Sequence, residues 1–283
     1  MLCFLNAFGF ILAFTASFFQ ERPLTKRRII INKERMRNLV ITTAVALTGL
    51  FTFSGCDDNS EDPVADVTSS LSAAFAEFDE DNTDIYLDGS NVVIETNGLP
   101  NHTTPYWGEG NALYVEPQEG FVSTPSLLTG YDGYATLTVS ANPAKASKTT
   151  ATSLGAIGIA VSGAAIFNDQ EGNGALSQAA VSLDYSGAHI GPAEYHYHTE
   201  PEAWTKDDEN LVGIIADGFF IYGRKCNSTG TYPTDLDESG GHTSTTQHST
   251  EALYHYHIEN ELYINKYYII FPGAYQGTPS SIR

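Results

Sequence analysis

The amino-acid sequence predicts a mainly β protein, a single compact β-rich domain with little helix. The 283-residue chain contains 16 Tyr and 15 Phe, which favour strands, together with 25 Gly and 12 Pro, which favour turns. Short apolar and aromatic segments recur along the second half, with turn residues between them. Part of this pattern occurs twice, which predicts a tandem pseudo-two-fold repeat of about 55 residues.

Individual strands are predicted from short alternating or β-branched segments. Residues 84–96 alternate and are bracketed by Asp-Gly and Asn-Gly pairs, a pattern typical of a hairpin. Residues 134–139 are rich in β-branched side chains, and residues 263–271 are rich in aromatic residues and Ile. Helical spacing is confined to residues 69–78 and 176–183, and both are marginal in length for a helix.

The repeat is found by comparing the sequence with itself. Three segments match in the same order, at offsets of 55, 53 and 59 residues: 157–168 on 212–223, 183–189 on 236–242, and 195–198 on 254–257. We therefore expect two copies, at 154–202 and 211–261, within a domain that spans residues 84–283.

Residues 1–55 are expected to direct export rather than to fold. A basic residue, an apolar stretch over 39–52 and small residues before Cys56 form the pattern of a lipoprotein signal that begins at Met36. Lipid on Cys56 then anchors the chain to a membrane of the cell envelope, facing outside the cytoplasm.

The start of the chain has two interpretations. In the first, Met36 is the initiator and residues 1–35 are an over-extended start. In the second, Met1 is the initiator and residues 1–19 form a transmembrane helix, which is short for a hydrocarbon core of roughly 30 Å. The first is favoured because the signal after Met36 is complete.

Charge excludes some partners. The chain has 14 basic and 34 acidic side chains, a net charge of −20. Residues 1–55 hold seven of the basic and two of the acidic ones, so the remainder carries 7 against 32, a net charge of −25. Such a protein is not expected to bind nucleic acid, and its field attracts cations. Residues 56–83 begin with an Asp, Ser and Pro-rich stretch and are expected to form the lipidated acidic tether.

Histidine is concentrated in the repeat, three residues in each copy. The candidate metal ligands are His189, His196 and His198 in the first copy and His242, His255 and His257 in the second. Residues i and i+2 of a strand share a face, so the two His of each Tyr-His-Tyr-His motif point one way and the Tyr point the other. The third His of each copy is expected from the turn upstream. Three imidazoles leave a coordination position open, as in catalytic zinc sites, and imidazole with carboxylate favours zinc or copper, with iron and nickel as alternatives.

Five more side chains are candidates for an extra ligand or for orienting an imidazole: Asp184, Asp237, Glu202, Glu261 and His102. The two Asp precede the turn His by five residues, so each either accepts an imidazole N–H or closes a turn. The two Glu have the HxHxxxE spacing found in cupin metal sites. With Cys56 acylated, Cys226 has no disulfide partner and is expected to be structural rather than a nucleophile.

Five motifs together resemble the YHYH-domain family of secreted and membrane-anchored bacterial proteins, which also has eukaryotic members. They are NGLPNH, GIAVSGAAIFN, DGFFIYG, LDESGGH and two copies of YHYH. The resemblance covers residues 97–275 and implies a β-rich extracytoplasmic domain without assigning an activity. Family members tend to carry Cys in D-x-C-x-GH segments, where Ser186 and Ser239 stand near those positions here. The resemblance therefore implies that a disulfide common in the family is lost.

Three classes of function remain open from the sequence. They are a metal-binding envelope lipoprotein, a metal-dependent hydrolase or oxidoreductase, and a structural or adhesive surface domain without metal. A serine hydrolase elbow, a phosphate loop and a dinucleotide fingerprint are missing from the sequence. The spacing does not decide whether the two copies form one shared site or two, and it indicates no protein partner.

Overall fold

The computed structural model describes residues 70–172, 174–191 and 194–283, which belong to one compact unit. Strands dominate this part of the chain, and its helices are all shorter than seven residues. The mainly β prediction is confirmed. The export signal, Cys56 and the first part of the tether lie outside the described residues.

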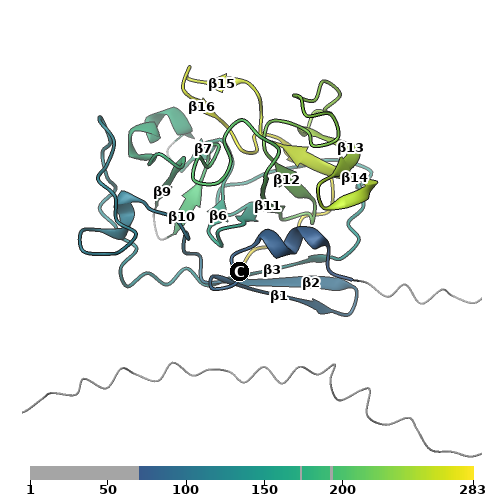
Figure 1. Ribbon diagram of the computed structural model, residues 1–283, viewed down its shortest axis with the longest axis horizontal. Helices are drawn as coiled ribbons and strands as arrows, with labels where there is room; N and C mark the ends of the chain where they lie inside the picture. Colours follow the sequence, from purple (N-terminus) through teal and green to yellow (C-terminus); the bar gives the residue numbers. More distant parts are fainter. Residues whose placement is uncertain (1–69, 173, 192–193) are drawn as a thin grey trace, which may run out of the picture. The chain divides into compact units, whose positions relative to one another are not determined.

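The central element is an eight-stranded mixed sheet with the order β13-β14-β12-β11-β5-β6-β10-β9 (Figure 1). Its two middle strands, β5 and β11, pair antiparallel. Outward from this pair, each half continues with an antiparallel, then a parallel, then an antiparallel pairing. The strands are β5 (Gly158–Ala160), β6 (Ala165–Ile166), β9 (Ala188–Ile190), β10 (Tyr195–Tyr197), β11 (Leu211–Ile215), β12 (Phe220–Tyr222), β13 (Gly241–Thr246) and β14 (Ser249–His257).

A three-stranded antiparallel sheet packs below the central sheet in the view of Figure 1. It consists of β1 (Thr83–Asp88), β2 (Asn91–Thr96) and β3 (Ala135–Ser140), so the hairpin and the strand expected here are confirmed. Ile94 and Leu137 of this sheet share one buried core with Ile159 and Ile214 of the central sheet. This contact buries one face of the central sheet.

The two stretches with helical spacing form only short 3-10 segments, in agreement with their marginal length. The first is a five-residue 3-10 helix, η2 (Ala73–Glu77), which ends because Phe78 is extended and buried in the core. The second is a pair of 3-10 turns, η4 (Leu176–Gln178) and η5 (Ala180–Ser182). One more such turn, η3 (Pro105–Trp107), follows the three-stranded sheet's first hairpin. Segments this short cannot repay helix nucleation, so tertiary packing decides their shape.

Residues 263–271 do not form the single strand that their composition predicts. The chain reverses at Ile264 and Asn265, both at positive φ, and forms a small hairpin of β15 (Leu262–Tyr263) and β16 (Tyr267–Tyr268). Asn tolerates this conformation, but Ile rarely adopts it, so the sequence pattern does not reveal the turn. Two further small strand pairs are β7 (Gln170–Glu171) with β8 (Gly174–Ala175) and β4 (Thr150–Ala151) with β17 (Ala274–Tyr275).

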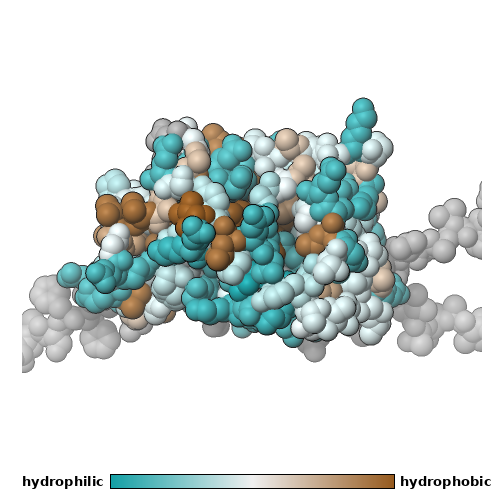
Figure 2. Space-filling view, turned by 90° about the horizontal axis from the view of Figure 1, so that it is seen from above, coloured by the Kyte–Doolittle hydropathy of each residue, from teal (hydrophilic) through white to brown (hydrophobic). Residues whose placement is uncertain are grey.

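The surface of the described part is mostly polar on the face drawn in Figure 2, where apolar residues form separate small groups among hydrophilic ones. Within residues 70–283, apart from the three that are not described, no helix has the length and hydropathy needed to cross a bilayer.

Two glycines allow the halves of the central sheet to meet. A Cβ on Gly158 would lie 2.6 Å from the carbonyl oxygen of Ile214, and one on Gly213 would collide with the carbonyl oxygen of Ile159. These neighbours are backbone atoms, which cannot move aside as a flexible side chain would. Glycine at both positions therefore permits the close approach of β5 and β11.

Gly213→Ala is expected to lower the free energy of unfolding by about 2 kcal/mol, within the range typical of overpacking. Gly191→Ala is the matched control, because its Cβ would meet no described atom within 4 Å and its φ is not in the left-handed region. Urea denaturation measures the free energy of unfolding of both variants. Equal values for Gly213→Ala and Gly191→Ala would contradict the prediction.

Candidate metal centres

The first Tyr-His-Tyr-His motif forms β10 and the residue after it, and the second forms the end of β14. All of these residues are buried except Tyr254, which is half-buried. Tyr195 and Tyr197 belong to the main core. His196 and His198 point to the opposite face and approach each other, with ring centroids 4.7 Å apart. The alternation expected of a strand therefore separates an apolar Tyr face from a His face.

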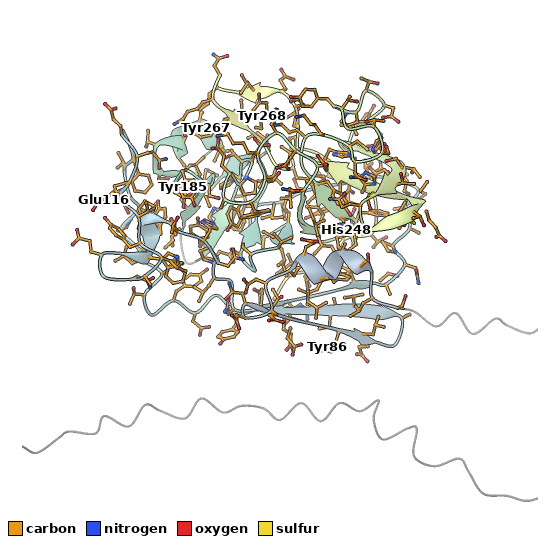
Figure 3. All side chains as sticks on the ribbon, in the orientation of Figure 1. Tyr86, Glu116, Tyr185, His248, Tyr267 and Tyr268 are labelled. Carbon is orange, nitrogen blue, oxygen red and sulfur yellow. The ribbon has the colours of Figure 1, made fainter. Side chains whose placement is uncertain are left out.

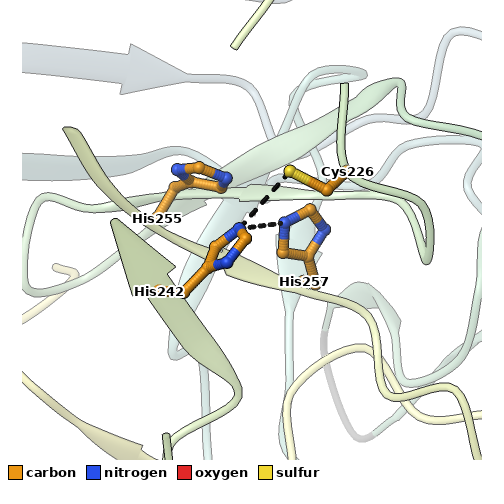
Figure 4. A group of neighbouring side chains, drawn as sticks. All are labelled: Cys226, His242, His255 and His257. Atoms are coloured by element: carbon orange, nitrogen blue, oxygen red, sulfur yellow. Dashed lines mark hydrogen bonds between the residues drawn. The ribbon is translucent and has the colours of Figure 1, made fainter. Parts of the chain in front are cut away.

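The structure gathers the six candidate histidines into two separate groups. Cluster 1 consists of Glu171, His189, His196 and His198; cluster 2 consists of Cys226, His242, His255 and His257 (Figure 4). Within each cluster, one ligand atom from each residue lies within 4.8 Å of the others. The six histidines thus form two separate groups, which the spacing alone did not decide.

The third His of each cluster comes from a strand and not from a turn. His189 on β9 stands directly opposite His196, and His242 on β13 stands directly opposite His255. The prediction of a turn position is therefore wrong. Cross-strand pairing brings these side chains together, because opposite residues have neighbouring Cβ atoms.

In cluster 1, each imidazole has its Nδ1 atom beside a fixed acceptor. Nδ1 of His196 lies 3.0 Å from the carbonyl oxygen of Glu194, and Nδ1 of His198 lies 2.6 Å from that of Asn168. Nδ1 of His189 lies 2.7 Å from the Ser182 hydroxyl, whose own hydrogen is donated to a backbone carbonyl. All three Nδ1 atoms are therefore the donors, so each Nε2 carries a lone pair.

Cluster 2 has the same arrangement. Nδ1 of His255 lies 2.9 Å from the carbonyl oxygen of Leu253, and Nδ1 of His257 lies 2.7 Å from that of Gly223. Nδ1 of His242 lies 2.9 Å from a carboxylate oxygen of Asp235. These contacts again direct three Nε2 lone pairs toward the centre of the cluster.

The inward atoms lie at hydrogen-bond distance from one another, but facing lone pairs have no hydrogen to share. Nε2 of His189 lies 3.0 Å from Nε2 of His196, and a Glu171 carboxylate oxygen lies 3.0 Å from Nε2 of both His189 and His198. Both this oxygen and Nε2 of His198 are buried without a hydrogen-bond partner. A bound cation would satisfy these groups, because imidazole and carboxylate are metal ligands.

Burial favours the neutral form of His196, His255 and His257, the form in which imidazole binds metal. It lowers the pKa of His255 to about 4 and the pKa of His257 to about 3. The pKa of His196 is also held well below its usual value, first by burial and then by the neighbouring imidazoles. For Glu171, burial opposes ionisation, but the adjacent imidazoles of His189 and His198 outweigh it and lower the pKa.

Of the two alternatives for Asp184 and Asp237, orienting an imidazole or closing a turn, the structure supports the turn, because both Asp lie on the Tyr side. The Tyr195 hydroxyl donates to Asp184 at 2.6 Å, and the Tyr254 hydroxyl donates to Asp237. Each Asp also accepts the backbone N–H two residues later, which closes an Asx turn. Their chemistry fits the structural alternative: a buried Tyr hydroxyl needs an acceptor.

The three remaining candidates are not brought into the described clusters either. Glu202 forms an exposed ion pair with Lys206 at 2.6 Å, and Glu261 is exposed before β15. His102 accepts from the Tyr197 hydroxyl at 2.8 Å, again on the Tyr side. The HxHxxxE analogy therefore fails, since the carboxylate of cluster 1 comes from upstream in the chain.

Sequence reasoning missed Glu171 and Cys226. The signal was present: the ungapped alignment of residues 157–168 on 212–223 extends three residues further and places Glu171 on Cys226 at the same offset of 55. The chemical difference between Glu and Cys concealed the match. The expectation that Cys226 has only a structural role did not anticipate its place beside three imidazoles.

One cavity adjoins cluster 2. It has a volume of about 420 Å³, and its lining includes His255, Tyr222, Phe219 and His248. His248, labelled in Figure 3, lies outside both clusters and contacts the Tyr222 hydroxyl. The cavity makes His255 the ligand nearest to a space that a small molecule can enter.

Comparison with known proteins identifies part of the chain. The family model described as YHYH protein matches residues 136–234, which confirms the resemblance over a shorter span than the expected 97–275. The matched segment contains all of cluster 1 and Cys226. Searches of curated proteins and of solved structures found no match.

Tyr195→Phe is expected to lower the free energy of unfolding by about 2 kcal/mol, because it removes a hydrogen bond to the buried Asp184. Tyr185→Phe is the control, since Tyr185 is 38% exposed and its hydroxyl contacts only the neutral Thr103 hydroxyl among described groups. Thermal and urea unfolding measure both. A Tyr195→Phe protein as stable as the control would show that this bond does not hold the strand.

Proposed function

We propose that this protein, whose residues 136–234 belong to the YHYH family, binds two transition-metal ions, one in each cluster. One observation carries the proposal: in each cluster three imidazoles donate through Nδ1 and converge through Nε2. Metal-binding imidazoles are typically held in this way, by a hydrogen bond from the ring nitrogen that faces away from the metal.

The donor atoms favour zinc or copper. Cluster 1 offers three imidazoles and a carboxylate, and cluster 2 offers three imidazoles and a thiol. Four protein donors per site form a closed set of the kind found in structural zinc sites, whereas catalytic sites keep one position open. The donor sets therefore support binding of metal without catalysis better than they support a metal-dependent enzyme.

A surface domain without metal is supported least. That function predicts that the imidazoles of each motif have separate hydrogen-bond partners on all sides. Instead, Nε2 of His198 and the Glu171 carboxylate oxygen face each other in a buried centre without such partners. Burying these groups without compensation would cost free energy.

A metal-dependent hydrolase or oxidoreductase is the second candidate. The cavity of about 420 Å³ beside His255 is the observation that favours it. For catalysis, cluster 2 would have to release one of its four donors so that substrate or water can reach the ion.

The same proposal includes a duplicated origin for the two sites. The symmetric order of strand pairings in the central sheet, with the matching offsets in sequence, supports a tandem repeat related by a pseudo-two-fold axis. Each copy then contributes one complete cluster.

The proposal also places the domain outside the cytoplasm, tethered by lipid on Cys56. The lipoprotein-like pattern before Cys56 and the acidic residues after it support this location. A net charge of −25 on the exported part would raise the concentration of metal cations around the domain.

The full-length protein, purified without a His-tag and supplied with zinc, is expected to retain two ions per chain. His198→Ala and His257→Ala are each expected to retain one, because each removes a ligand from one cluster only. His248→Ala is the matched control and should retain two. Elemental mass spectrometry of the dialysed proteins gives the counts, and a wild-type protein without transition metal would refute the proposal.

Metal removal is expected to destabilise the protein. An ion present at 1,000 times its Kd stabilises the folded state by about 4 kcal/mol. For a domain of this size, each kcal/mol shifts Tm by roughly 2–4 °C, so loss of one ion lowers Tm by roughly 8–16 °C.

Calorimetry with and without a chelator checks this expectation. The double variant His198→Ala/His257→Ala should show no chelator effect. A shift of equal size in that variant would mean that the effect does not come from the clusters.

A further inference from the structure

Glu171 and Cys226 occupy corresponding places in the two halves. They are 55 residues apart, the same offset that relates the strands around them. Each follows by three residues the backbone carbonyl that accepts from a ligand imidazole, that of Asn168 for His198 and that of Gly223 for His257. The fourth donor of each cluster is thus presented by the same local backbone.

The other three donors are the same in both clusters. The chemical difference therefore lies in one donor atom, a carboxylate oxygen in cluster 1 and a sulfur in cluster 2. A second difference lies behind it: the residue seven positions before the third His is Ser182 for His189 and Asp235 for His242. A carboxylate bonded to Nδ1 makes the imidazole of His242 a stronger electron donor than a hydroxyl makes that of His189.

The surroundings of Cys226 suit a thiolate. Its side chain is fully buried, and Sγ lies 3.4 Å from Nε2 of His242. The hydroxyls of Ser228 and Ser244 lie 3.1 Å and 3.3 Å from Sγ. The Ser244 hydroxyl donates to the carbonyl oxygen of Thr245, which leaves the Ser228 hydroxyl as the donor to Sγ. This donor and a bound cation both stabilise the anionic sulfur, which is the form that ligates metal.

We infer that the two clusters select different metals: cluster 2 is the site for a thiolate-preferring ion, and cluster 1 is the site for a harder divalent ion. The inference rests on the proposed metal binding and adds the class of ion for each site. Thiolate ligands favour soft ions, whereas carboxylate ligands favour harder ones such as Mn²⁺. One chain therefore holds two unlike ions when both are supplied.

Cadmium and manganese distinguish the sites. Metal-free, untagged full-length protein is titrated with Cd²⁺, and the sulfur-to-cadmium charge-transfer absorbance in the ultraviolet is followed. The band is expected to reach its full height at the first equivalent, because cluster 2 fills first. With Mn²⁺ in excess, one Cd²⁺ per chain should remain bound and one Mn²⁺ should enter.

Two variants assign the band to one atom. Cys226→Ser should abolish the band and weaken cadmium binding at cluster 2 at least tenfold, while Mn²⁺ still binds at cluster 1. Glu171→Cys should add a second thiolate and double the final absorbance. Glu171→Ser is its control and should leave the band unchanged, and circular dichroism checks that each variant is folded.

The outcomes separate this inference from the function on which it rests. Two cadmium ions that bind with equal affinity and yield equally to Mn²⁺ would overturn the selectivity but leave metal binding intact. A charge-transfer band that survives Cys226→Ser would also overturn it. A wild-type protein that takes up neither Cd²⁺, Mn²⁺ nor Zn²⁺ would refute the proposed function itself.

Discussion

The two-residue period of the Tyr-His-Tyr-His strands is the constraint on which both clusters depend. Hydrogen bonds of 2.6 Å from Tyr195 to Asp184 and from Tyr256 to Asp217 fasten one face of these strands in the core. Because neighbouring residues of a strand point to opposite faces, the His side chains of both strands then lie on the other face, away from this core. A slip of one residue would exchange the faces, burying imidazoles in the apolar core and withdrawing every ligand from its cluster.

The outer hydrogen bonds of the imidazoles explain why the clusters are ready to accept a cation. Four of the six acceptors are backbone carbonyls held in place by the fold. Because the rings are oriented before any ion arrives, binding need not order them, which favours affinity. The same closed arrangement leaves little freedom at cluster 1, whereas cluster 2 borders a cavity through His255. Any chemistry beyond binding is therefore more readily placed at cluster 2.

Local periodicity made part of the site predictable. The shared face of His196 and His198 follows from strand geometry, and so does that of the second pair. The role of Asp184 was not predictable, because its partner Tyr195 is brought to it by strand pairing. Glu202 instead pairs locally with Lys206, four residues later in the chain. The hairpin at residues 262–268 was missed for a similar reason, since packing rather than propensity decides such brief segments.

The sequence by itself determined the strand-rich class, the repeated order of motifs and the six histidines, since these depend on neighbours along the chain. Only the tertiary structure decided that the histidines form two clusters and that Glu171 and Cys226 complete them. It also placed the third His of each cluster on a strand. The physical reason is that a metal site needs donors within a few ångströms of one point, and such convergence depends on long-range strand pairing, which sequence spacing does not record.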